Sequence, residues 1–337
     1  MMTDFYTLAI ETSCDDSSVA ILKNEREILT NLISSQIDTH ALFGGVVPEI
    51  ASRKHLEAIN PLIDKAIEEA NITYDDIDLI TVTKGPGLIG SLLVGISSAK
   101  ALALALGVPL VGANHMKGHI CANYLSNKDL EPPFVCLVVS GGHTYLCKVS
   151  DYNDIEVVGS TRDDAAGESY DKVARKIGLG YPGGPKIDKL AKKGNGKAID
   201  FPRVMLEKGS YDFSFSGLKT AVLNYAHNEE QKGNEVNRAD LAASFQEAVV
   251  DVLVEKSLML LEETGYKQFA ISGGVAANSR LRERFTEELG KRDIKFYYPD
   301  TILCTDNAAM IAMAGYLDYK AGVRDNTYMK VYPNLDL

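Results

Sequence analysis

The sequence predicts an α/β protein in which one architecture occurs twice. Three strand-like segments open the chain within residues 5–33, and three comparable segments recur within residues 134–160. After each set, segments with helical spacing of apolar residues alternate with short apolar segments typical of buried strands. Alternating strands and helices are typical of a sheet covered by helices. We therefore expect a duplicated α/β fold with two lobes and a cleft between them; one large mixed sheet is the alternative.

In the first copy, the apolar segment at 5–11 has the composition of a buried strand, and Asn24-Glu25 supplies a turn between its two hairpin partners. In segment 48–70, apolar residues stand three and four positions apart. Pro48 stands near the start of that segment, where a helix tolerates proline. The expected strands are 5–11, 18–23, 27–33, 79–83 and 109–112, and the expected helices are 48–70 and 88–106.

The second copy begins with an apolar strand at 134–139, and a Gly-Gly turn follows it at 141–142. Several helices are expected within 168–265. The other expected elements are strands at 144–149, 154–160, 268–271 and 295–297 and helices at 274–289 and 306–320. No low-complexity segment or long linker separates the two copies.

Composition indicates a soluble globular protein of 337 residues, long enough for two domains. Its five cysteines are scattered, their number is odd and no CxxC occurs, which favours the reducing cytoplasm. The first residues lack the basic start and apolar run of a signal peptide. Segment 88–113 holds a single charge, Lys100, but glycines and a Gly-Val-Pro break favour a buried helix and strand over a membrane span. We expect a cytoplasmic protein with no membrane contact.

The net charge of −11 is unevenly distributed. Segment 172–203 carries nine cations against two acids, a local charge of +7. Such a patch on an acidic protein can bind a polyanion in one orientation, whereas a solvated helix face is the alternative. The nine cations are Lys172, Arg175, Lys176, Lys186, Lys189, Lys192, Lys193, Lys197 and Arg203.

Two histidines stand four positions apart in the segment NHMKGH at 114–119. If this segment is helical, His115 and His119 lie on one face, about 5–6 Å apart, and can chelate one metal ion. The segment lacks the central Glu of HExxH, and two structural histidines are the alternative. Spacing does not choose a third ligand. Asp306 is a candidate because it precedes an expected helix, and an ion held there would link the two lobes.

Three polar loops follow expected strands: ETSCDDSS at 11–18, VVSGGHT at 138–144 and ISGGVAAN at 271–278. Paired glycines let backbone N–H groups approach an anion, as phosphate-binding loops do. Ordinary turns and a routine strand-to-helix connection are the alternatives. The segment GPGLIGS at 85–91 lacks the GK[ST] ending of a phosphate loop and is interpreted as a structural turn. His40, His55 and His227 are expected at the surface.

With these motifs the chain resembles the bacterial type of the universal tRNA threonylcarbamoyladenosine transferases, the TsaD family. The resemblance extends over nearly the whole chain. It is carried by GGVVPE at 44–49, GPGL at 85–88, NHMKGH at 114–119, SGGHT at 140–144 and SGGVAAN at 272–278.

The resemblance implies a duplicated, two-lobed actin-like fold (the ASKHA fold of sugar kinases and Hsp70) with a central cleft. We expect lobes at 1–112 plus 306–337 and at 113–305, the second carrying the two histidines and most substrate contacts. It also implies one divalent metal per chain, iron with zinc or magnesium as alternatives, held by His115, His119 and Asp306. The implied substrate is threonylcarbamoyl-AMP, with ATP or ADP as a further ligand. Its implied contacts are Val138, Val139, Ser140, Gly141, Gly142, Asp171, Gly184, Asp188 and Asn278.

The implied reaction passes the threonylcarbamoyl group to N6 of adenosine 37 in tRNAs that read ANN codons, with release of AMP. The implied partners are tRNA, an inactive paralogue of the same fold (TsaB type) and a small P-loop ATPase (TsaE type). Asp15 is the candidate general base, since its carboxylate stands on the first turn. The alternatives are an actin-like kinase or ATPase, a non-catalytic scaffold paralogue and, last, a metalloprotease.

Overall fold

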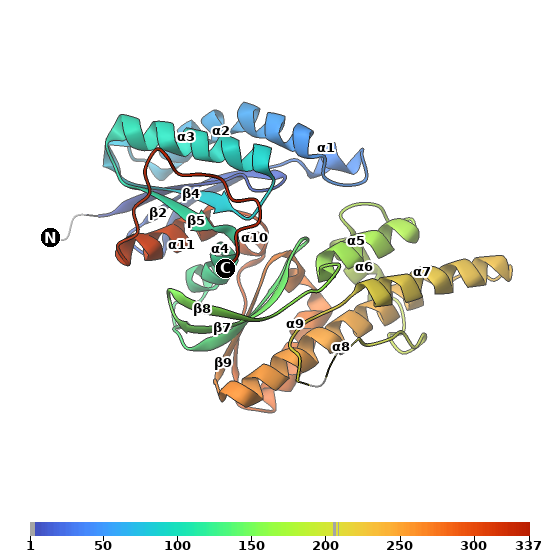
Figure 1. Ribbon diagram of the computed structural model, residues 1–337. Coiled ribbons are helices and arrows are strands. Elements are labelled where there is room, and N and C mark those ends of the chain that lie inside the picture. The colour runs from blue at the N-terminus through green and yellow to red at the C-terminus, as the bar shows by residue number, and fades with distance from the viewer. Residues whose placement is uncertain (1–3, 205–206, 208) are drawn as a thin grey trace. The chain divides into compact units, whose positions relative to one another are not determined.

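The computed structural model describes residues 4–204, 207 and 209–337 (Figure 1). The chain forms two compact units. Unit 1 comprises Met1–Glu131 with Pro299–Leu337, and unit 2 comprises Pro132–Tyr298.

Within its described residues, unit 1 holds a five-stranded sheet in the order β3-β2-β1-β4-β5. The strands β1, β2 and β3 form an antiparallel meander, and β4 and β5 extend it in parallel with β1. The bounds are β1 (Tyr6–Glu11), β2 (Asp16–Lys23), β3 (Glu27–Ser35), β4 (Ile77–Gly85) and β5 (Leu110–Asn114).

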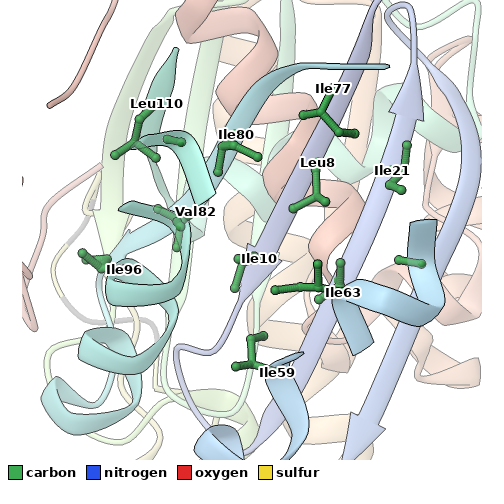
Figure 2. Packing of buried hydrophobic residues seen from close by; sticks show 14 of the residues in the cluster. Leu8, Ile10, Ile21, Ile59, Ile63, Ile77, Ile80, Val82, Ile96 and Leu110 are labelled. Carbon is green, nitrogen blue, oxygen red and sulfur yellow. The ribbon is translucent and has the colours of Figure 1, made fainter. Parts of the chain in front are cut away.

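The helices of unit 1 lie on the two faces of this sheet (Figure 1). They are α1 (Ile37–Ala41), α2 (Pro48–Ala70), α3 (Ile89–Leu106), α4 (His115–Ser126), α10 (Thr301–Cys304) and α11 (Ala308–Lys320), with a 3₁₀ turn at Tyr74–Asp76. On one face, branched side chains of the strands pack against α2 and α3. Figure 2 shows Leu8, Ile10 and Ile21 of the strands beside Ile59 and Ile63 of α2.

On the other face, α11 packs against the sheet and against α4. Its sequence is rich in Ala and Gly, which allows a close approach. A Cβ added at Gly315 would lie 2.4 Å from Cγ2 of Thr81. The contact between α4 and α11 places both helices in unit 1.

Helix α3 is long and apolar enough to cross a membrane by length and composition alone. It nevertheless packs on α2 and β4, and Val94, Ile96 and Ala99 belong to the core of unit 1. On the opposite side of the helix, Ile89, Leu93 and Leu104 are 58%, 49% and 74% exposed. One face of the helix expected at 88–106 therefore belongs to the core of unit 1, and the other face is exposed.

Unit 2 repeats the same sheet: its described residues form five strands in the order β10-β9-β6-β7-β8. Again three antiparallel strands are extended by two parallel ones. The strands are β6 (Phe134–Val139), β7 (Thr144–Asp151), β8 (Asp154–Ser160), β9 (Gln268–Ser272) and β10 (Lys295–Tyr297). The expected duplication is confirmed, and the alternative of one large mixed sheet is excluded.

The helices of unit 2 are α5 (Ala166–Lys176), α6 (Gly183–Ala191), α7 (Ser216–Gln231), α8 (Arg238–Thr264) and α9 (Ser279–Gly290). Helix α8 contacts α6, α7, α9 and β6 and supplies much of the buried apolar surface. The helix expected at 274–289 is split, because a 3₁₀ turn at Gly274–Ala277 precedes α9 and Asn278 caps α9.

The boundaries of the two units differ from the lobes expected at 1–112 plus 306–337 and at 113–305. Residues 113–131 and 299–305 belong to unit 1. The physical reason is the packing of α4 on α11, a contact between segments almost 200 residues apart in sequence.

Candidate metal centre and substrate loops

The histidine pair lies on one face of a buried helix, as the spacing predicts. The side chain of Asn114 accepts hydrogen bonds from two backbone N–H groups of the first turn, which starts α4 at His115. The rings of His115 and His119 lie 4.7 Å apart, and the two residues are 6% and 0% exposed. The i, i+4 spacing of the two histidines on one helix therefore places their imidazole rings side by side.

Asp306 completes a three-residue cluster. It stands just before α11, whose N-terminus Asn307 caps by accepting a hydrogen bond from the N–H of Met310. Oδ1 of Asp306 lies 3.4 Å from Nε2 of His115 and 3.3 Å from Nε2 of His119. The three ligand atoms lie within 4.8 Å of one another. All three residues belong to unit 1, so the expectation that an ion there links two lobes is wrong.

The donor chemistry of this cluster fits a divalent metal ion. Within the described part of the chain, Nδ1 of the fully buried His119 has no hydrogen-bond partner, and Nε2 has only the carboxylate of Asp306, 3.3 Å away. A buried imidazole with so few polar partners is costly, and a metal ion on Nε2 would reduce that cost. Two imidazoles with one carboxylate form a set that binds Fe(II), and zinc uses the same ligand types.

The electrostatics of the cluster also favour a cation. Burial opposes protonation of His115, but Asp306 and Glu11 raise its pKa to about 10. Burial lowers the pKa of His119, whereas the charge of His115 outweighs burial and holds the pKa of Asp306 well below its usual range. The buried carboxylate of Glu11 and the half-buried carboxylate of Asp306 thus need a positive charge between them, which either a proton on His115 or a metal ion supplies.

Sequence reasoning missed Glu11, a fully buried carboxylate at the end of β1. It accepts hydrogen bonds from the N–H of Ser13 and the hydroxyl of Thr83. Its Oε2 also lies 3.1 Å from Nδ1 of His115. The signal in the sequence was a charged residue ending an apolar strand, which is rarely buried without a partner.

Asp15 follows on the turn from β1 to β2, and Asp16 is the first residue of β2. The carbonyl of Asp15 accepts a hydrogen bond from the N–H of Gln36, 3.2 Å away, which anchors the turn. Burial raises the pKa of Asp16 to about 7, against a hydrogen bond from Ser35 that lowers it. Carboxylates with raised pKa values gather at functional sites, so sequence reasoning also missed Asp16.

The expectation that His40 and His55 lie at the surface is wrong, because both are fully buried. Nδ1 of His55 lies 2.7 Å from the hydroxyl of Ser17, and its Nε2 lies 2.9 Å from the carbonyl of Cys14. His55 therefore braces the turn that carries Asp15. His227 is exposed, as expected.

The turn at 85–88 is structural, as the sequence indicated. The N–H of Leu88 donates to the carbonyl of Ser13 over 2.7 Å. A Cβ added at Gly87 would lie 2.6 Å from that same carbonyl oxygen. The glycine lets the turn pack directly on the loop after β1.

In unit 2, two of the expected loops lie side by side because β6 and β9 are parallel neighbours. Val138 and Val139 are buried at the end of β6, and the N–H of Ser140 closes the next turn by donating to the carbonyl of His143. Gly273 follows β9 with φ +86°, and a Cβ there would lie 2.4 Å from the carbonyl oxygen of Val139. Only glycine fits this position, and the turn containing Gly141 and Gly142 stays open to solvent.

Hydrogen bonds connect the other expected substrate residues to these loops. Oδ1 of Asp171 accepts from the N–H of Gly183 over 2.6 Å, which joins α5 to the start of α6. Both carboxylate oxygens of Asp188 accept from the hydroxyl of Ser279, at 2.9 and 3.0 Å, which joins α6 to α9. Beside Gly184, the space around Cα is open.

Asn278 caps α9 by accepting from the N–H of Leu281, and its amide donates to Gln246 over 2.8 Å. All nine expected substrate residues therefore lie in unit 2. Five are at the end of β6 and in the turn after it, Gly184 and Asn278 are at the starts of α6 and α9, and Asp171 and Asp188 stand within α5 and α6. Carboxyl ends of parallel strands and helix N-termini are common anion-binding positions.

The basic segment is partly neutralised by acids from elsewhere in unit 2. Lys172 forms 2.8 Å ion pairs with Asp164 and Glu168. Lys176 and Arg203 also pair with acids outside the segment, Glu230 and Asp251, whereas Lys192 pairs with Asp188 inside it. The charge counted along 172–203 therefore exceeds the charge available to a polyanion.

Comparison with known proteins identifies the family of the chain. The family model described as tRNA N6-adenosine threonylcarbamoyltransferase (TsaD) matches residues 27–313. A protein of that name from Clostridium botulinum (strain 657 / Type Ba4) is 58% identical over 330 residues, covering 98% of this chain and 97% of its own length. Another of that name, from Clostridium perfringens (strain 13 / Type A), is 57% identical with the same coverage.

Among solved structures, HypF from T. kodakarensis superposes with a TM-score of 0.65 at 15% identity, covering 95% of this chain and 48% of that one. Component A of (R)-2-hydroxyglutaryl-CoA dehydratase from Acidaminococcus fermentans gives a TM-score of 0.56 at 16% identity, with 95% and 100% coverage. These likenesses confirm the actin-like fold class. With the family model and the relatives in agreement over almost the entire sequence, the chain belongs to the tRNA N6-adenosine threonylcarbamoyltransferases, enzymes that act on tRNA.

Proposed function

We propose that this chain transfers the threonylcarbamoyl group of threonylcarbamoyl-AMP to N6 of adenosine 37 in tRNAs that read ANN codons, with release of AMP. Family membership supports a transferase that acts on tRNA. The observation that carries the proposal is the gathering of His115, His119 and Asp306 within 4.8 Å in a chain of this family.

The proposed metal ligands are Nε2 of His115, Nε2 of His119 and Oδ1 of Asp306. The ion is iron, with zinc or magnesium as alternatives. When bound, a divalent ion supplies Lewis acidity that can polarise a carbonyl or stabilise a phosphate. The convergence of Nε2 of His115 and Nε2 of His119 on Oδ1 of Asp306 supports this assignment.

The proposed substrate site uses the loops of unit 2. Backbone N–H groups at Gly141 and Gly142 bind the phosphate of the adenylate, because this open turn lets an anion approach the chain. Ser140 holds the turn in place, since its own N–H donates to the carbonyl of His143. Asp171, Gly184, Asp188 and Asn278, with Val138 and Val139 beneath them, bind the adenosine part. ATP or ADP would bind the same residues.

In the proposed reaction, the N6 amine of the tRNA adenosine attacks the carbamoyl carbonyl carbon. A C–N bond forms, the bond to the AMP oxygen breaks, and AMP leaves with that electron pair. Asp15 takes the proton that N6 loses.

We further propose that the reaction takes place in the cytoplasm, that cations of the 172–203 segment contact tRNA, and that the inactive paralogue and the small P-loop ATPase assist. The decisive experiment incubates the purified chain with threonylcarbamoyl-AMP and an ANN-reading tRNA, with and without those two proteins. Formation of threonylcarbamoyladenosine at position 37 supports the proposal. Steady ATP turnover without tRNA and no transfer under any condition would overturn it in favour of an actin-like ATPase.

A further inference from the structure

The carboxylate of Glu11 lies behind the candidate metal ligands, where it cannot reach solvent. We propose that Glu11 is a positioning residue that holds the Nδ1–H tautomer of His115 and so presents Nε2 to the metal. This inference rests on the metal site of the proposed function.

The contacts of His115 define which nitrogen carries the proton. Nδ1 lies 3.1 Å from Oε2 of Glu11 and 3.1 Å from the hydroxyl of Ser13. On the other side of the ring, Nε2 lies 3.4 Å from Oδ1 of Asp306. An ionised carboxylate only accepts hydrogen bonds, so in the metal-free ring a proton on each nitrogen faces a carboxylate. When a metal ion takes the lone pair of Nε2, the one remaining proton stays on Nδ1, where Glu11 accepts it.

The surroundings of Glu11 require an ionised carboxylate. Three donors converge on its two oxygens: the N–H of Ser13 on Oε1, and the hydroxyl of Thr83 and Nδ1–H of His115 on Oε2. The side chains of Thr83, Ser13 and Glu11 are all buried. If either carboxylate oxygen of Glu11 carried a proton, that proton would point at the hydrogen of another donor group and repel it.

This convergence follows from the topology of the sheet. Strand β1 lies parallel to β4, and β4 lies parallel to β5. Glu11 ends β1, Thr83 stands near the end of β4, and His115 follows β5. The carboxyl ends of three neighbouring parallel strands thus bring together residues that are far apart in sequence.

The two histidines differ in this respect. Within the described residues, Nδ1 of His119 has no hydrogen-bond partner, whereas Nδ1 of His115 has two oxygens in reach. Glu11 therefore acts on one ligand only. A carboxylate behind a metal-bound histidine fixes the ring and increases its basicity, and loss of such a partner typically weakens metal binding about 10- to 100-fold.

Glutamine cannot replace this carboxylate without a conflict. If its amide oxygen faces His115, its NH₂ group meets the N–H of Ser13, which is also a donor. If the amide is turned, its NH₂ group meets Nδ1 of His115 and favours the wrong tautomer, with the proton on Nε2.

The test titrates the metal-free chain with Co²⁺ and records the dissociation constant and the visible absorption spectrum of the bound ion. We expect Glu11→Gln to weaken Co²⁺ binding about 10- to 100-fold and to change the spectrum. The matched control, Glu57→Gln, makes the same change at an exposed acid of α2 and should bind Co²⁺ within about threefold of the parent chain. Equal affinity and an identical spectrum for Glu11→Gln would overturn the inference.

A second measurement does not depend on the folding of a variant. In the Zn²⁺-loaded parent chain with ¹⁵N-labelled histidine, the NMR spectrum should show His115 with a proton on Nδ1, assigned by comparison with His115→Gln. A proton on Nε2 instead would overturn the inference. Failure of the parent chain to bind Co²⁺ or Zn²⁺ at all would instead overturn the proposed metal site, which keeps the two failures distinct.

Discussion

At the scale of single residues, the site depends on buried polar groups that need specific partners. His119 is fully buried, its Nδ1 has no hydrogen-bond partner within the described residues, and its Nε2 has only the carboxylate of Asp306 in reach. Glu11 is equally buried but accepts two hydrogen bonds and lies 3.1 Å from Nδ1 of His115. A buried polar group without a partner costs about 1–3 kcal/mol. The burial of His119 with so few polar partners therefore indicates a ligand more strongly than its position in the motif does.

The first prediction concerns the metal ligands. Replacing His119 by Ala removes one of three donor atoms, and we expect stoichiometric metal to be lost from the purified protein. His227→Ala is the matched control, since that histidine is exposed. Elemental analysis after purification checks both. Full metal content in His119→Ala would show that the ion, if present, is bound elsewhere.

The second prediction concerns the proposed base. Asp15→Asn keeps the size of the side chain but cannot take a proton, so we expect threonylcarbamoyl-AMP binding within about threefold and transfer to tRNA reduced about 100-fold or more. Single-turnover transfer and equilibrium binding measure the two effects. Unchanged turnover would show that Asp15 is not the base. Asp16, whose raised pKa of about 7 suits a proton acceptor, would then be the candidate.

At the scale of elements, the site is held by contacts between helices and strand ends. In unit 1, α11 packs closely on the sheet at Gly315. Asp306 stands just before this helix, so the packing of α11 places Asp306 beside α4. In unit 2, Asp164 connects two helices, through ion pairs of 2.8 Å to Lys172 of α5 and 2.6 Å to Lys219 of α7.

The third prediction tests the approach of α11. Gly315→Ala places a Cβ 2.4 Å from Thr81, so the helix must move, and we expect a loss of about 1–3 kcal/mol in unfolding free energy. Asp306 stands just before α11, so a shift of the helix should displace this ligand and weaken Co²⁺ binding as well. Gly290→Ala, where a Cβ meets nothing within 4 Å, is the control. Urea denaturation that shows no difference between the two variants would contradict the argument.

The fourth prediction concerns pH. Burial opposes ionisation of Asp164, but Lys172 and Lys219 outweigh it and lower its pKa from the ordinary value of 3.8. A lowered carboxyl pKa adds stability above the unfolded value, and that stability disappears as the pH falls through the folded value. We expect Asp164→Asn to cost about 1–2 kcal/mol at pH 7 and progressively less below pH 3.8.

Urea denaturation across this pH range provides the measurement. The exposed Glu287→Gln serves as the control because it removes one acid of unit 2 outside this cluster. A cost for Asp164→Asn that stays constant down to pH 2 would contradict the electrostatic explanation.

At the scale of the whole molecule, two units with the same strand order carry different chemistry. Unit 1 holds the ligands of the candidate metal site, and unit 2 holds the glycine-rich loops and the basic segment. Because the net charge of the chain is −11, any contact with RNA depends on where its cations gather on the surface.

The fifth prediction tests that contact. The double reversal Lys189→Glu and Lys193→Glu should weaken tRNA binding and make its dependence on salt concentration shallower, because fewer counterions are released. The double reversal Lys54→Glu and Lys65→Glu on α2 changes the net charge equally and should have a smaller effect. Equal effects of the two pairs at every salt concentration would reject the basic segment as a tRNA contact.

The sequence by itself determined the elements of this protein and their repetition. Periodicity located strands and helices in both copies, and the i, i+4 spacing of His115 and His119 placed them on one helix face, because both features depend only on neighbours in the chain. Family motifs added the activity class, which the comparisons confirm.

Only the tertiary structure decided which distant residues meet. It placed Asp306 in the same unit as the histidines, buried His40 and His55, brought Glu11 and Thr83 behind His115, and paired part of the basic segment with distant acids. Local patterns carry no information on these contacts, because parallel strand order and helix packing join segments tens to hundreds of residues apart. The chemistry of the site depends on such contacts, since burial and hydrogen-bond partners set which groups carry protons or bind cations.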